Sequence, residues 1–290
     1  MADAAPLALT WAAFWLRMLG EHAAARRTRR PRSRLARRRA LAFYGGLLVI
    51  VAAIATPIDT LSQRLLWIHM IQHVLLLSVA APLIVLGAPW MSLWRPLPLG
   101  LRRALARAVA LSPGGAPLRS VRRVLSRPIA VVLMFGVGLL AWHAPALYDT
   151  ALSNSDVHAA EHLTFLGLGI LLWAQVIPSP PFRPSLAYPR RIVYLVAAML
   201  PNVALSILLA FSRSPLYPFY AGLTHRPGGI SAFTDQQIAA GIMWSFGDLP
   251  FVIAIVVIAV RWLGRIDEDA DAIPSGAPVS AHTRPGWRVT

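Results

Sequence analysis

The amino-acid sequence predicts an all-α membrane protein, a polytopic bundle of seven transmembrane helices with its N-terminus outside and its C-terminus in the cytoplasm. Three observations predict it. The 290 residues are 57% hydrophobic, with a mean hydropathy of +0.58, and only 14% are charged, whereas soluble domains carry about 25% charged residues. Seven apolar segments approach or reach the length that crosses a bilayer. Arginines gather in alternate connections between these segments.

The apolar segments give the helix count in order along the chain. They run approximately over 5–24, 40–56, 65–86, 128–143, 158–177, 190–211 and 236–262. The first contains Arg17 and Glu21, which lie four residues apart and can pair on one helix face. If this segment does not span, six spans remain. We expect residues 1–265 to form a single transmembrane domain and residues 266–290 to form a disordered cytoplasmic tail.

The distribution of arginines fixes the expected orientation, because arginine-rich connections stay on the cytoplasmic side. The rich connections are 25–39, 87–127 and 178–191, with nine, eight and three arginines; the poor ones are 57–64, 144–157 and 212–235, with one, none and two. Rich and poor connections alternate along the chain. The N-terminus is therefore expected outside and the C-terminus inside.

The longest arginine-rich connection mixes arginines with Leu, Ala and Val at helical spacing over residues 98–126, interrupted by SPGGAP. This pattern is typical of an amphipathic helix at the membrane surface. An ordinary solvated loop is an equal alternative.

The composition excludes several functions. The chain has no cysteine, which excludes disulfides and thiolate ligands. All 28 basic residues are arginine, so a retinal Schiff base and a Walker A lysine are excluded as well. The net charge of +16 lies mainly in runs beside apolar segments, which favours membrane orientation over nucleic-acid binding.

Five of the eight histidines fall near the outer ends of three segments. His69 and His73 lie four apart in WIHMIQH, His158 and His162 lie four apart in HAAEH, and His143 ends the fourth segment. A spacing of four places two imidazoles on one helix face. A single such pair is often structural, but several ionisable side chains at one depth in a membrane are costly and usually functional. We expect these five histidines to form a metal site.

The depths of the two pairs support a shared site. Counted from outer ends near Leu65 and Asp156 at 1.5 Å per residue, the first pair lies about 6 and 12 Å along its helix and the second about 3 and 9 Å. These ranges overlap, with His143 at the shallow edge. If the three helices pack with these faces inward, the imidazoles can converge on one ion.

The residues leave the metal open, because copper, zinc and iron all accept imidazole ligands. Met70 and Met243 offer thioethers that favour Cu(I), although methionine in a membrane helix more often only packs. Glu161 and Asp235 can orient imidazole N–H groups or lie solvated at the rim. We expect His225, in an outer loop, not to be a ligand.

Several stretches carry a family resemblance. HMIQHVLLLSVAAPLIVLGAP (69–89), WHAPALYDTAL (142–152), HAAEHLTFLGLGILLW (158–173), PLYPFY (215–220) and DQQIAAGIMW (235–244) resemble the seven-helix cytochrome c oxidase assembly factor CtaG family of bacteria, which serves caa3-type oxidases. The resemblance covers roughly residues 40–265.

The resemblance implies a protein of the bacterial cytoplasmic membrane that helps to mature a haem–copper oxidase, with an oxidase subunit as partner and copper as the ion. It also implies that the five histidines, Asp235 and Gln236 belong to the polar pattern of the family. One departure follows Trp244. The family commonly continues with Pro-Gly, whereas this chain has SFGDLP, which places Asp248 near mid-membrane.

The favoured function is that of a non-enzymatic assembly factor that binds copper at the outward-facing histidines and passes it to the oxidase. One alternative is a copper transporter that uses Asn202 and Asp248, beside Pro201 and Pro250, as deeper polar groups. A second is a haem-binding oxidoreductase, which requires facing histidines at mid-depth. A zinc hydrolase is a minor alternative, because HAAEH matches the inverted zinc motif HxxEH only approximately.

The arginine count generates a topological prediction. Cysteines introduced singly at Ser112 and Asn154, in this cysteine-free chain, should label differently in intact cells, because the first lies in a rich connection and the second in a poor one. An impermeant thiol reagent should label Asn154→Cys and spare Ser112→Cys. The reverse pattern would overturn the orientation.

Overall fold

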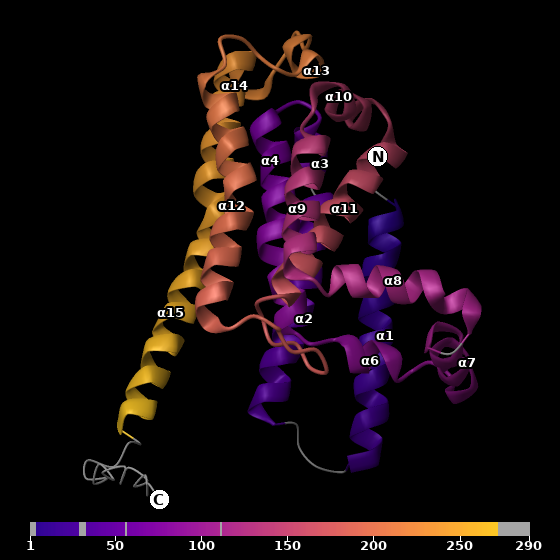
Figure 1. Cartoon of the computed structure of the whole chain (residues 1–290). Helices are drawn as coiled ribbons and strands as arrows, with labels where there is room; N and C mark the ends of the chain where they lie inside the picture. Colours follow the sequence, from indigo (N-terminus) through magenta and orange to yellow (C-terminus); the bar gives the residue numbers. More distant parts are fainter. Residues whose placement is uncertain (1–3, 29–32, 56, 111, 272–290) are drawn as a thin grey trace, which may run out of the picture.

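The computed structural model describes residues 4–28, 33–55, 57–110 and 112–271, and the described chain is almost entirely helical. Each of the seven predicted segments contains a long helix, and Figure 1 shows these helices running alongside one another. They are α1 (Ala4–Thr28), α2 (Arg34–Ile54), the run α4 (Leu66–Val74), η1 (Leu75–Ala80) and α5 (Ala81–Leu86), then α9 (Pro128–Trp142), α11 (Ser155–Ala174), α12 (Tyr188–Phe211), and the run α14 (Ala232–Ile242), η4 (Met243–Gly247) and α15 (Asp248–Asp271).

Four of these helices are long and apolar enough to cross a membrane. They are Leu66–Leu86, Ser155–Ala174, Tyr188–Phe211 and Ala232–Arg265. A fifth candidate is the bent pair of α8 (Ala116–Leu125) and α9, which meet at 85°. The described helices thus contain four or five candidate spans. The first two predicted segments form helices but fall short of this criterion, since arginines occupy the start of α2 and a charged pair interrupts α1.

The charged pair in α1 is compensated, as its spacing predicts. Arg17 Nε donates to Glu21 Oε1 at 2.9 Å, and Arg17 Nη1 donates to the Gly87 carbonyl at 2.9 Å. The guanidinium also lies 4.5 Å from the centre of the Phe43 ring, a favourable cation–π contact. A buried arginine with these partners ties α1 to α2 and to the end of α5.

Two π-helical segments interrupt the long helices that carry the site, and prolines account for both. η1 ends two residues before Pro82, and η4 ends three residues before Pro250. A proline cannot donate to the carbonyl one turn earlier, and its ring crowds that carbonyl, so the preceding turn widens. The two segments contact each other, because Ser78 Oγ donates to the Gly247 carbonyl at 3.0 Å.

Helix α11 approaches the run α4–η1–α5 closely. A Cβ added to Gly169 would lie 2.9 Å from Ala81 Cβ and 3.1 Å from the Leu77 carbonyl oxygen, so this contact requires glycine. The Trp173 indole N–H donates to the same Leu77 carbonyl at 3.1 Å. These contacts hold the HAAEH and WIHMIQH helices side by side.

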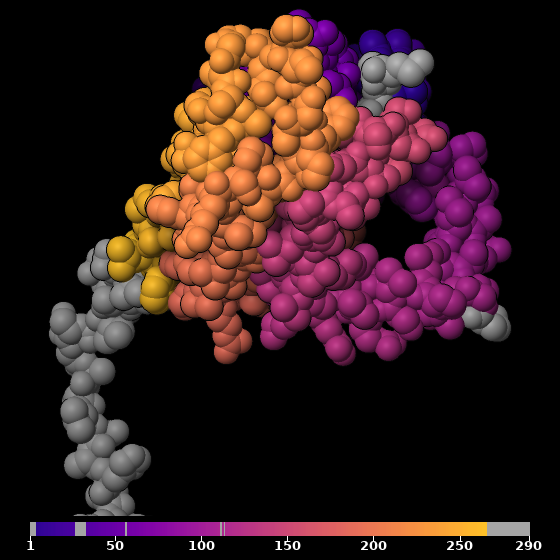
Figure 2. All heavy atoms as spheres, turned by 90° about the horizontal axis from the view of Figure 1, so that it is seen from above, coloured from indigo at the N-terminus to yellow at the C-terminus, as the bar shows by residue number. Residues whose placement is uncertain are grey.

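The connection over 98–126, for which the sequence leaves a membrane-surface helix and a solvated loop open, contains two helices in its described part. α7 (Leu99–Ala110) and α8 flank a break at the SPGGAP stretch, which contains η2 (Pro113–Gly115). Figures 1 and 2 show both helices standing out from the bundle at one side. Leu118, Val121 and Val124 on α8 are exposed. Contact of this surface with lipid stays a prediction.

Short helices close the ends of the bundle. α10 (Pro145–Ser153) and α13 (Pro218–Ala221) lie at the same end as the start of α14 (Figure 1). The others are α3 (Pro57–Ser62), α6 (Trp90–Trp94) and η3 (Pro227–Gly229). At the C-terminus, α15 continues to Asp271, six residues beyond the predicted domain boundary at 265. The rest of the predicted tail lies outside the described residues.

Candidate metal centre

Three helices bring the five histidines together. α4 carries His69 and His73, α11 carries His158 and His162, and His143 follows the last turn of α9. The ring centroids of His69 and His158 lie 5.2 Å apart, those of His73 and His162 5.9 Å, and those of His73 and His143 5.7 Å. None of the five is more than 6% exposed. The packing of faces expected from their depths is therefore observed.

Two subsets have ligand atoms close enough to share an ion. Nitrogen atoms of His69, His73 and His162 lie within 4.8 Å of one another. Ligand atoms of His69, His158 and Glu161 form a second group within the same distance. His69 belongs to both groups, so they are neighbouring parts of one cluster. His143 lies beside it, against His73, as the sequence predicts.

The orientation of His143 fixes which nitrogen is available. Its Nδ1 lies 2.8 Å from the Leu139 carbonyl oxygen. A carbonyl can only accept, so Nδ1 carries the proton and the Nε2 lone pair of the neutral ring is left over. This Nε2 is buried without a hydrogen-bond partner in the described structure. A backbone carbonyl on the far nitrogen is a usual orienting partner of metal-binding histidines.

His69 is oriented in the same way by tyrosine. Its Nδ1 lies 3.1 Å from the Tyr220 hydroxyl and 3.0 Å from the Tyr148 hydroxyl. Tyr220 donates its own proton to the Ser62 carbonyl at 2.5 Å, so its oxygen is free to accept from Nδ1–H. The lone pair of His69 then lies on Nε2, which points toward the cluster.

Both tyrosines stay protonated. Tyr148 lies in α10 and Tyr220 in α13, and burial raises the pKa of each hydroxyl well above its ordinary value. Tyr148 is 0% and Tyr220 2% exposed. α10 and α13 therefore cover one side of the cluster with neutral hydrogen-bonding groups.

Glu161 lies at the centre of the cluster. Its carboxylate oxygens lie 3.7 Å from His69 Nε2 and 3.5 Å from His73 Nε2, and the residue is 0% exposed. The sequence predicts an orienting role or a solvated rim position for this carboxylate. The observed position instead makes Glu161 a candidate ligand beside His69 and His158.

Asp235 and Gln236 have other partners. The two carboxylate oxygens of Asp235 accept from the Leu66 N–H at 2.9 Å and the Trp67 N–H at 3.0 Å, so Asp235 caps the start of α4. Gln236 accepts from the Leu216 N–H at 2.7 Å and donates to the Leu209 carbonyl at 3.1 Å. Both residues therefore connect helices around the cluster. Asp235 was expected to orient an imidazole, but tyrosine hydroxyls contact His69 and a backbone carbonyl contacts His143 instead.

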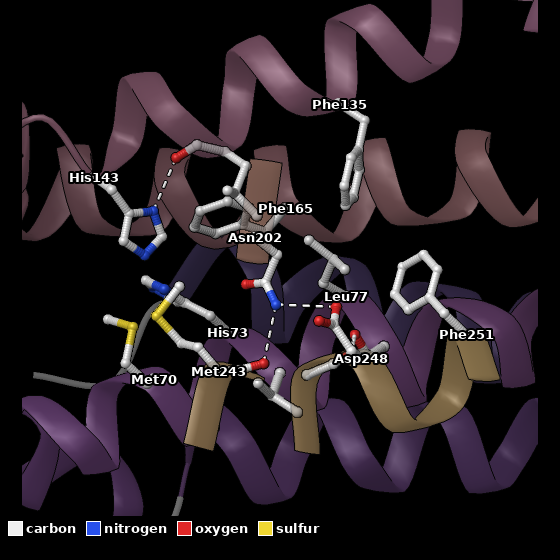
Figure 3. Close-up of a pocket in the computed structure, with 14 residues that line it drawn as sticks. Met70, His73, Leu77, Phe135, His143, Phe165, Asn202, Met243, Asp248 and Phe251 are labelled. Atoms are coloured by element: carbon white, nitrogen blue, oxygen red, sulfur yellow. Dashed lines mark hydrogen bonds between the residues drawn. The ribbon is translucent and has the colours of Figure 1, made fainter. Parts of the chain in front are cut away.

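A narrow cavity begins at the edge of the cluster formed by His73 and His143, which we call the inner edge. It has about 30 Å³ of space that the centre of a water molecule can reach, enough for one or two waters. Figure 3 shows His73, His143, Met70 and Met243 at one end. Asn202 and Asp248 lie farther along.

Asn202 and Asp248 are partners. Asn202 Nδ2 donates to Asp248 Oδ1 at 3.0 Å and to the Met243 carbonyl at 2.9 Å. Asp248 is 4% exposed, and its Oδ2 has no hydrogen-bond partner in the described chain.

Tyr148 and Tyr220 are site residues that the sequence does not predict. Both stand in stretches that carry the family resemblance, WHAPALYDTAL and PLYPFY. Their positions in the sequence do not predict that both hydroxyls contact the His69 imidazole, because α10 and α13 are short and have no helical periodicity to extrapolate. His225 is exposed and belongs to neither group of close ligand atoms among the described residues.

One comparison with known proteins identifies a family. Residues 22–265 match the model of the cytochrome c oxidase caa3 assembly factor family. The chain is 26% identical over 230 residues to uncharacterised proteins of Mycobacterium bovis and Mycobacterium tuberculosis, and 26% identical over 231 residues to one of Mycobacterium leprae. Each match covers 77% of this chain and 34% of the relative, so the chain spans about a third of the length of these relatives. No solved structure matches.

The cap on α4 generates a stability prediction. Asp235→Ala leaves the Leu66 and Trp67 N–H groups without their acceptor, and a buried donor left unsatisfied costs about 1–3 kcal/mol. The detergent-purified variant should therefore unfold at a temperature several degrees below that of the wild type. The control is Asp156→Ala, which removes an exposed acid from the first turn of α11. It should lower the unfolding temperature less than Asp235→Ala does. Equal shifts would show that the cap contributes nothing specific.

Proposed function

The chain belongs to the cytochrome c oxidase caa3 assembly factor family, and from this membership and the histidine cluster we propose that it binds copper and passes it to a haem–copper oxidase subunit. Copper is the cargo, and the role is non-enzymatic. We further propose seven spans in the bacterial cytoplasmic membrane, with the N-terminus outside, because the arginine-rich connections alternate along the chain. The cluster then faces outward.

One observation carries the copper proposal. His143 and His69 each present Nε2 inward because a carbonyl or a tyrosine holds Nδ1. Histidines that only hydrogen-bond in a core use both nitrogens where they can, whereas the Nε2 atoms of His69, His73 and His143 have no hydrogen-bond partner in the described residues. Lone pairs that converge on a buried carboxylate fit a cation. Copper(II) has the highest affinity for such nitrogen ligands among first-row divalent metals.

The arrangement disfavours haem. The ring centroids within the two pairs lie 4.4 Å apart in α4 and 4.2 Å apart in α11. Across the helices the rings are in direct contact as well. A porphyrin between two axial histidines needs the rings on its opposite faces, and this cluster leaves no space between them.

Metal stoichiometry tests the shared site. His73→Gln and His162→Gln should each reduce the Cu(II) bound per detergent-purified chain from one to well below one, and the double variant should lose no more. Glutamine keeps a polar side chain of similar length without an imidazole. The exposed His225→Gln is the matched control and should bind like the wild type.

Two outcomes would contradict this account. Partial losses that add in the double variant would indicate two separate sites. Unchanged stoichiometry in all variants would leave the cluster as structural histidines. In cells that depend on this protein, the double variant should also yield oxidase with less copper than the wild type does.

Transport is the second candidate function, and one observation favours it. Asp248 and Asn202 pair farther along the cavity that starts at His73 and His143. These are the polar groups that an ion leaving the cluster inward would meet. An unpaired carboxylate oxygen in a membrane helix is costly, so its presence calls for a function.

Asp248→Asn separates the two functions. A protein that acts in assembly alone should show unchanged copper accumulation in cells and unchanged Cu(II) content at the histidines, because Asp248 lies outside the cluster. Asp156→Asn, at an exposed position, is the control. Lower accumulation in Asp248→Asn with the histidine site still loaded would favour transport over assembly.

A further inference from the structure

The inner edge of the cluster differs chemically from its centre. The centre offers imidazoles and the Glu161 carboxylate. The inner edge, at the start of the cavity, offers His73, His143, Met70 and Met243. Figure 3 shows both sulfur atoms on the same side as these two imidazoles. Three different elements therefore supply donors to this edge: α4, η4 and the end of α9.

The four side chains are buried, and their imidazole nitrogens include atoms without a hydrogen-bond partner in the described chain. Met70 is 0% and Met243 3% exposed. Both nitrogens of His73 and Nε2 of His143 are buried with no hydrogen-bond partner in the described chain. Methionine commonly fills gaps in a core, but here two thioethers line the same cavity as two imidazoles with unsatisfied nitrogens. A packing role alone does not require that the two sulfurs lie beside these imidazoles.

We propose that His73, His143, Met70 and Met243 form a distinct position for Cu(I) at the inner edge of the cluster. This inference rests on the proposed copper function. Thioethers and imidazoles are soft and intermediate ligands that select Cu(I), whereas a carboxylate-containing group suits divalent ions. His73 also belongs to the group with His69 and His162, so the two positions share this residue. A reduced ion is held at the methionine edge and a divalent ion at the carboxylate.

Metal competition on the full-length protein in detergent tests the position, with Ag(I) as a redox-inert probe for Cu(I) and Zn(II) as the divalent probe. The variant is Met70→Leu combined with Met243→Leu, since leucine conserves volume and costs little stability. Even partners outside the ligand set change metal affinity by about 10–100-fold. Loss of two direct ligands should thus weaken Ag(I) and Cu(I) binding at least about tenfold while Zn(II) affinity stays the same.

The control is Met134→Leu combined with Met199→Leu, two methionines of α9 and α12 that do not line the cavity. It should bind all three ions like the wild type. X-ray absorption of the Cu(I)-loaded wild type should show sulfur neighbours that the Met70/Met243 variant lacks.

Unchanged Cu(I) affinity in the Met70/Met243 variant would overturn the inner position, and so would equal losses for Cu(I) and Zn(II), which would indicate damaged packing. A wild type that binds neither ion would instead contradict the proposed copper function itself. The two failures are therefore distinguishable.

Discussion

The constraint on which the structure depends is the burial of five imidazoles and one carboxylate in a single cluster. A buried polar atom without a partner costs about 1–3 kcal/mol, and more if it is charged. Tyr220 and Tyr148 satisfy Nδ1 of His69, and the Leu139 carbonyl satisfies Nδ1 of His143. The Nε2 atoms of His69 and His73 are left facing the Glu161 carboxylate. A cation at the centre would satisfy the nitrogen lone pairs and the carboxylate together. Neither nitrogen of His73 has a hydrogen-bond partner in the described structure.

The bundle is arranged so that this cluster can form. Gly169 lets α11 approach the helix run that begins with α4, and Asp235 caps the start of α4. Tyr148 and Tyr220 bring α10 and α13 over one side of the cluster through their contacts with His69. On the inner side, the π-helical turns that precede Pro82 and Pro250 meet through Ser78. They position Met243 and Asp248 along one cavity.

Much of this architecture is predictable from the sequence, and the exceptions have physical causes. Apolar length predicts the seven long helices, because this pattern is local, although only four or five of them are candidate membrane spans. The shared depth of His69, His73, His158 and His162 predicts their convergence, since helical rise is regular. The role of Asp235 was not predictable, because its partners on α4 lie 168 and 169 residues away in sequence. The same holds for Tyr148 and Tyr220, which reach His69 from short helices without periodicity. The central position of Glu161 depends on the rotation of α11, which spacing alone leaves open.

The central claim is that the histidines of α4 and α11 hold one ion together. Anomalous diffraction at the copper edge from crystals of Cu(II)-loaded protein tests it most directly. The account predicts a single strong peak between the two helices, within ligand distance of at least one histidine from each. A peak confined to exposed His225, or no peak inside the bundle at full copper loading, would contradict it.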